Sequence, residues 1–122
     1  MEDYIKTLDM KSIADTKMDA EGFINAYNKN EAILLDVRYP FELNAWKLTF
    51  SLDIPLNELP DRLNELPKDK LIVCACPESY RSNIARQYLI SKGYKAKTLS
   101  CGILKLTERL TGGKAKDIKI KI

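Results

Sequence analysis

Short apolar runs, each followed by a polar break and then a helical pattern, restrict the possible fold of this chain more than any other feature. Residues 32–35 and 71–75 are the two clearest runs, and their length suits buried strands. Helical patterns follow both, at residues 41–46 and 82–92. Strands that alternate with helices predict an α/β fold with a mostly parallel sheet.

Weaker patterns complete this arrangement. Two further strands are expected at residues 52–54 and 95–99. Further helices are expected at residues 20–28, 57–65 and 103–110. Asp19 is a suitable N-cap for the first of these helices, and Gly93 a suitable end for the helix over 82–92. Near the N-terminus, Tyr4, Ile5 and Leu8 would share one face of a short helix.

Length and charge define the broad class. The 122 residues, 45% apolar and 30% charged, fit one globular domain. We divide the chain into an N-terminal extension (1–17), a domain (18–111) and a basic tail (112–122), whose alternating end at 118–122 could add an edge strand. A net charge of +3 does not favour nucleic acid as a partner. Without a signal peptide or an apolar run long enough for a membrane, the expected location is the cytoplasm.

The chain contains no histidine, which removes several mechanisms. Ser-His-Asp and Cys-His catalysis cannot operate within it. The three cysteines fall one ligand short of a structural zinc site. We therefore predict neither a metal nor a cofactor, and any nucleophile must be activated without imidazole.

Cys76 is the strongest candidate nucleophile. It stands between the strand over 71–75 and the helix that follows, where backbone N–H groups and the helix dipole favour a thiolate. Arg81 adds a permanent positive charge five positions later. Cys74, two residues earlier in the strand, is interpreted as core packing. Because Asp36, Cys76 and Cys101 each follow a predicted strand, they should gather at one edge of the sheet.

Four segments, in this order, resemble the rhodanese-like family over roughly residues 18–106. The first is Leu35-Asp36-Val37-Arg38 followed by Glu42, and the second is Ile54-Pro55-Leu56. The third is Ile72-Val73-Cys74-Ala75-Cys76 with Arg81-Ser82, and the fourth is Gly102-Ile103-Leu104. Each motif alone is weak, but their order and spacing together are fairly specific.

The resemblance implies a single-domain sulfurtransferase with a five-stranded parallel sheet and helices on both faces. Cys76 would carry a persulfide, loaded by thiosulfate, polysulfide or another persulfide and unloaded by a thiophilic acceptor, which a protein could also supply. The expected substrate-binding residues are Glu78, Ser79, Tyr80, Arg81 and Ser82. Asp36, Arg38 and Cys101 would support the site, the first two as an ion-pair network and Cys101 as a candidate resolving thiol.

Two alternatives stay open. Pro77 lacks an N–H, Glu78 places a negative charge near an anion site, and residues 46–51 lack the family's glycines and histidine. These departures favour a catalytically silent module that binds a partner. A phosphatase or arsenate reductase on the same fold is less favoured, because the related phosphatases have one more residue between cysteine and arginine.

Overall fold

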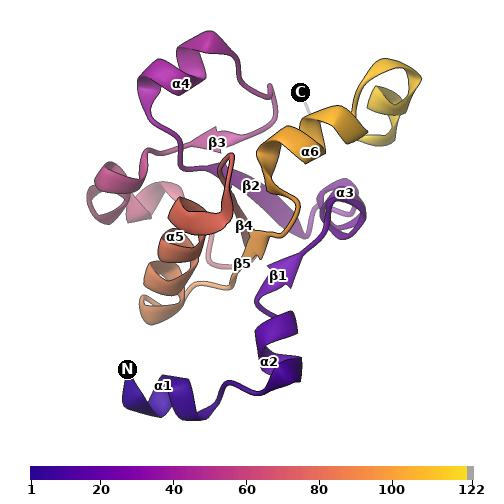
Figure 1. The fold of residues 1–122 in the computed structure, drawn as a ribbon. Helices are drawn as coiled ribbons and strands as arrows, with labels where there is room; N and C mark the ends of the chain where they lie inside the picture. The colour runs from indigo at the N-terminus through magenta and orange to yellow at the C-terminus, as the bar shows by residue number, and fades with distance from the viewer. Residues whose placement is uncertain (121–122) are drawn as a thin grey trace.

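The computed structural model describes residues 1–120, and its centre is a sheet of five parallel strands (Figure 1). In chain order the strands are β1 (Lys17–Met18), β2 (Ala32–Asp36), β3 (Leu52–Asp53), β4 (Leu71–Ala75) and β5 (Ala96–Leu99). Across the sheet their order is β1-β5-β4-β2-β3, and every neighbouring pair is parallel. The predicted α/β fold with a five-stranded, mostly parallel sheet is confirmed.

Helices cover both faces of this sheet, also as predicted. One face carries α5 (Ser79–Ser91) and the 3-10 helices η1 (Leu56–Asp61) and η2 (Leu63–Glu65), and the other carries α3 (Ala20–Asn28) and α6 (Gly102–Arg109). Successive strand residues point to opposite faces. Cys74 therefore packs with Leu89 of α5, whereas Val73 packs with Phe23 of α3.

The fifth strand, β1, was missed by the sequence prediction. It has only two residues, which carry no alternating apolar pattern. It exists because Lys17 and Met18 pair with Thr98 and Leu99 of β5. The Thr98 N–H also donates to the Thr16 carbonyl at 2.9 Å. Such a strand is created by its partner and leaves no pattern of its own to detect.

Two predicted helices differ from the structure. The helix expected over 57–65 is instead the two 3-10 helices η1 and η2, because Pro60 lies inside the segment and supplies no N–H for an α-helical bond. The helix expected over 82–92 begins three residues earlier, at Ser79. The residues Ser79, Tyr80 and Arg81 are consequently its first turn, where they were expected to lie in a loop. The short α4 (Pro40–Ala45) begins at a proline, as helices often do.

Short helices lie near both ends of residues 1–120. The N-terminal residues form α1 (Glu2–Lys6) and α2 (Met10–Ala14), at the foot of the molecule in Figure 1. After α6 comes the 3-10 helix η3 (Gly112–Asp117), and the following Ile118 is buried against the α3 face. Residues 118–120 form no strand, and 121–122 lie outside the described residues.

None of the helices within residues 1–120 has the length and apolar character needed to cross a membrane.

Gly102 fixes how closely α6 approaches the end of β4. Its φ is +77°, a region that favours glycine. A Cβ at this position would lie 2.8 Å from the Pro77 carbonyl oxygen. The next N–H, of Ile103, donates to the Cys76 carbonyl at 3.1 Å. The absence of a side chain therefore lets α6 hold the backbone of Cys76 and Pro77.

We predict that Gly102→Ala destabilises the protein more than Gly112→Ala. Gly112 also has positive φ, +59°, but a Cβ added there would have no other atom within 4 Å. Gly112→Ala should lower the free energy of unfolding by about 1 kcal/mol, because alanine is disfavoured at a positive φ. At Gly102 the added clash should bring the loss to about 2–4 kcal/mol. Urea unfolding measures both, and equal losses would contradict the close-approach argument.

Candidate active site

Cys76 directly follows β4 and is 2% exposed. The Ser82 N–H, in the first turns of α5, donates to Cys76 Sγ at 3.3 Å, and Ser82 Oγ lies 3.4 Å from the same sulfur. The thiol also contacts the carbonyl oxygen of Glu78, which is the N-cap residue of α5. The sulfur thus lies beside the N-terminal turn of a 13-residue helix, whose dipole favours negative charge.

The ends of three neighbouring strands meet around this cysteine, as the sequence predicts. The Val37 N–H, just after β2, donates to the Ala75 carbonyl at 3.1 Å. From the other side, the start of α6 is hydrogen-bonded to the Cys76 carbonyl through Ile103. The Cys76 loop is therefore fixed on both flanks by backbone hydrogen bonds.

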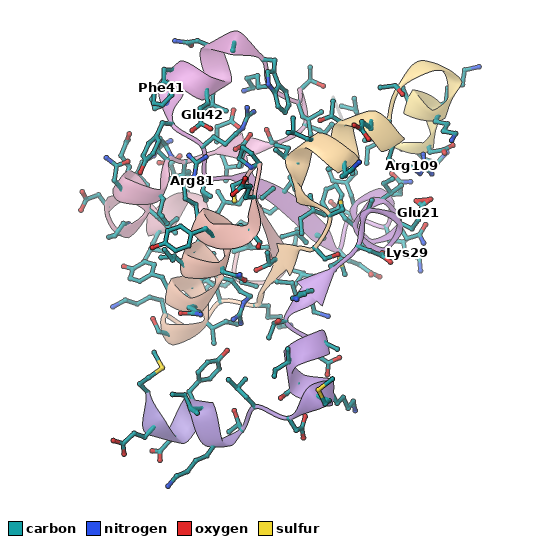
Figure 2. The ribbon with its side chains drawn as sticks, viewed as in Figure 1. Glu21, Lys29, Phe41, Glu42, Arg81 and Arg109 are labelled. Carbon is teal, nitrogen blue, oxygen red and sulfur yellow. The ribbon has the colours of Figure 1, made fainter. Side chains whose placement is uncertain are left out.

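Arg81 is held by a carboxylate from another helix. Its Nη1 and Nη2 lie 2.5 and 2.9 Å from Oε1 and Oε2 of Glu42 in α4, and Figure 2 shows the two side chains together above α5. The guanidinium also stacks over the Tyr39 ring at 5.3 Å. The hydrogen bonds to Glu42 are the main cause of the raised pKa of Arg81. The charge interaction with Cys76 raises it by a smaller amount. Arg81 consequently ties the first turn of α5 to α4, with its charge largely neutralised.

Asp36 and Arg38 form a second, fully buried ion pair. Arg38 Nη2 and Nε lie 2.9 and 3.0 Å from Asp36 Oδ2, and both residues are at most 1% exposed. The Arg38 guanidinium lies 4.0 Å from the Trp46 ring centre, and Nη2 also donates to the Trp46 carbonyl at 3.1 Å. This pair braces the connection from β2 through α4, next to the Cys76 loop. The side-chain hydrogen bonds of this pair are to one another and to the Trp46 carbonyl, and none joins it to the Cys76 sulfur within residues 1–120.

The other residues expected in the site differ in whether they contact the Cys76 sulfur. Ser82 contacts the Cys76 sulfur, whereas the side chain of Tyr80 is 76% exposed. Glu78 is exposed. The carbonyl oxygen of Ser79 accepts a hydrogen bond from Ser82 Oγ at 3.1 Å. Within residues 1–120, Ser82 supplies the only backbone N–H that donates to Cys76 Sγ.

The remaining two cysteines have different surroundings. Burial raises the pKa of Cys74 to about 12, so it is a neutral thiol in the core. Cys101 packs against the cluster on the α3 and α6 face, whereas Cys76 belongs to the cluster on the α5 face. Burial also raises the pKa of Cys101. Cys101 is a free thiol, and its resolving role stays a prediction.

Two residues of the site were not among those predicted from the sequence. Glu42 was noticed only as part of a motif, and its pairing with Arg81 spans 39 positions of the chain. Gly102 was likewise noticed only as part of a motif, without its close approach to Pro77. Only the motif pointed to Glu42, because no local pattern connects two side chains so far apart.

We predict that Glu42→Gln weakens the fold in a pH-dependent manner. Pairing with Arg81 lowers the pKa of Glu42 from 4.5 to about 2. The stabilisation is therefore complete above pH 4.5 and is lost as the pH falls toward 2. At pH 7 the variant should lose about 1–2 kcal/mol of unfolding free energy, and this difference should shrink in acid.

The matched control is Glu58→Gln, at a more exposed carboxylate 3.3 Å from Arg62. This change should cost about 0.5 kcal/mol or less. Denaturant unfolding of both variants from pH 7 to pH 2 provides the comparison. A Glu42→Gln deficit that persists unchanged at pH 2 would contradict the ion-pair explanation.

Comparisons with known proteins agree with this geometry. Residues 19–109 match the family model of the Rhodanese-like domain. A protein named sulfurtransferase from Allochromatium vinosum is 29% identical over 90 residues, which cover 74% of this chain and 76% of that protein. Mitochondrial thiosulfate sulfurtransferase RDL2 from Saccharomyces cerevisiae is 29% identical over 105 residues, covering 75% and 68% of the two chains.

A solved structure, reduced CoADR-RHD from Bacillus anthracis, is 38% identical with a TM-score of 0.65. The match covers 74% of this chain but only 16% of that much longer one. The family match extends over most of the chain, including β2, Cys76 and α6. The chain belongs to the rhodanese-like domain family.

Proposed function

We propose that this protein is a sulfurtransferase or persulfide carrier that moves sulfane sulfur through a persulfide on Cys76. Relatives named sulfurtransferases support sulfur transfer in general. The observation that carries the proposal is the position of the Cys76 sulfur at the first turns of α5, where the Ser82 N–H donates to it. A backbone donor and a helix dipole stabilise the negative charge on sulfur that each half-reaction requires.

The reaction has two balanced steps. In the first, the Cys76 thiolate attacks the outer sulfur of the donor, forming a new S–S bond while the donor's S–S bond breaks and its electron pair leaves with the donor. In the second, an acceptor nucleophile attacks the outer sulfur of the persulfide. The Cys76 S–S bond then breaks, and Cys76 leaves as a thiolate.

The charges around the loop favour a singly charged persulfide over thiosulfate as the donor. Glu42 neutralises Arg81, and Glu78 is exposed beside the cysteine with no ion pair among residues 1–120. Pro77 supplies no N–H. These groups together leave about one negative charge at the loop, which repels a dianion more strongly than a donor of lower charge.

A partner-binding module without catalysis is the second candidate. Two observations favour it: Cys76 is only 2% exposed, and Arg81 is engaged by Glu42 instead of facing a substrate. This candidate predicts no sulfur uptake at Cys76. The experiment below therefore separates the two functions.

We predict that wild-type protein exposed to cysteine persulfide or polysulfide gains the mass of one sulfur atom. Cys76→Ser should gain none, because it removes the nucleophile. Cys74→Ser and Cys101→Ser should still be loaded and serve as matched controls. Intact-mass spectrometry measures all four proteins, and loading of Cys76→Ser equal to that of wild type would exclude the proposed role of Cys76.

We also predict that Glu78→Gln accelerates loading by thiosulfate. Removing one nearby negative charge should increase the rate about two- to tenfold at low salt, corresponding to about 0.4–1.4 kcal/mol. The gain should diminish as salt screens the charge. Glu31→Gln, at an exposed glutamate before β2, is the control and should not change the rate. An unchanged rate in Glu78→Gln would show that its charge does not select the donor.

A further inference from the structure

Arg86 is a buried cation without a counter-ion among residues 1–120. It lies in α5 on the inner side and is 7% exposed. Its Nη2 donates to the hydroxyl oxygen of Tyr4 in α1 at 3.2 Å, and its buried Nε has no hydrogen-bond partner. Buried charges in proteins are normally paired with an opposite charge. A buried guanidinium whose Nε is unpartnered is therefore a candidate anion-binding group.

A cavity of about 240 Å³ adjoins this guanidinium. Its walls come from α1, α2, α5 and the start of β5, and they include Tyr4, Leu8, Asp15, Arg86, Ile90 and Ala96. A second cavity of about 240 Å³ shares Tyr4 and Ile90 with the first and has a largely apolar lining that includes Met1. Since one water molecule occupies about 30 Å³ of liquid, this space accommodates a small organic molecule.

The cavity lies away from the candidate active site. In Figure 1, α1 and α2 are at the foot of the molecule, whereas α4, which holds the Glu42 partner of Arg81, is at the opposite end. Most of the walls come from residues before 19, where the family match begins. This site therefore belongs to the N-terminal segment of this chain together with α5.

The polar groups at the cavity have opposite charges. Tyr4 accepts from Arg86, so its own hydroxyl proton remains free to donate to an anion. Arginine and a neighbouring hydroxyl are well suited to a carboxylate. Asp15 lines the same cavity, is exposed at its rim and has no ion pair within residues 1–120. A carboxylate of this kind is suited to an ammonium group.

The hydroxyl groups on the wall do not alter this charge pattern. Thr7, Ser12 and Thr16 already donate to backbone carbonyls, at 2.6, 3.0 and 2.6 Å respectively. One cation and one anion therefore dominate the polar recognition, next to an apolar space.

We propose that the cavity between α1, α2 and α5 binds a free α-amino acid with an apolar side chain. Arg86 and Tyr4 receive its carboxylate, Asp15 receives its ammonium group, and the aliphatic side chain lies against Ile90. Binding neutralises Arg86, which has no counter-ion among residues 1–120.

Analogues of leucine test this proposal on the wild-type protein, with isothermal titration calorimetry as the measurement. L-leucine should bind saturably with one site per chain. N-acetyl-L-leucine lacks the ammonium group and L-leucinamide lacks the carboxylate, so each should bind about tenfold more weakly or worse. Glycine, without the apolar side chain, should also bind more weakly. Absence of saturable L-leucine binding, or equal affinity for N-acetyl-L-leucine, would overturn the proposal.

Single substitutions test the binding role of Asp15 and of Tyr4 separately. In Asp15→Asn, the affinity for L-leucine should fall to that for N-acetyl-L-leucine, whereas Asp3→Asn, an exposed aspartate in α1 outside the lining, should bind as wild type. Tyr4→Phe should weaken binding of every ligand that carries a carboxylate. Unchanged affinity in both Asp15→Asn and Tyr4→Phe would overturn the assignment. Loading of Cys76 by cysteine persulfide, measured in parallel, should be retained, so failure of this site is distinguishable from failure of the sulfur-transfer proposal.

Discussion

The parallel pairing of β2 with β4 is the interaction on which the rest of the structure depends. Five residue pairs join the two strands, from Ala32 with Leu71 to Asp36 with Ala75. Both strands are buried on both faces, so their apolar side chains supply core to α5 on one side and to α3 and α6 on the other. The same register brings the ends of the two strands together. Asp36 lies opposite Ala75, the residue directly before Cys76, for this reason, although the two are 39 positions apart in the chain.

Charge is distributed around the candidate site in two ion pairs with different burial. Asp36 and Arg38 are removed from water, and Trp46 covers the guanidinium. Glu42 and Arg81 are partly exposed and connect α4 to the first turn of α5. Neither pair presents an unpaired positive charge to a substrate. A persulfide at Cys76 would therefore depend on the Ser82 N–H and the helix dipole more than on arginine.

The distribution of apolar residues made most of the fold predictable. Four strands were expected close to where they are found, and the apolar runs of β2 and β4 correctly implied that both faces are covered. The errors occurred where local pattern is weak. The two-residue β1 depends on pairing with β5, and Pro60 converts an expected α-helix into 3-10 turns. The start of α5 at Ser79 was hidden because a loop and a first helical turn carry the same polar residues.

The sheet class, the family resemblance and the position of Cys76 between a buried strand and a helix could be read from the amino-acid sequence, because they follow from short-range pattern and spacing. The partners of the charged groups became visible only in the folded chain. The contact of Arg81 with Glu42 joins residues 39 positions apart, and that of Arg86 with Tyr4 joins residues 82 positions apart. Within residues 1–120, no carboxylate pairs with Arg86. Such contacts depend on how helices pack across the sheet, and that packing is set by the whole core and not by any one segment.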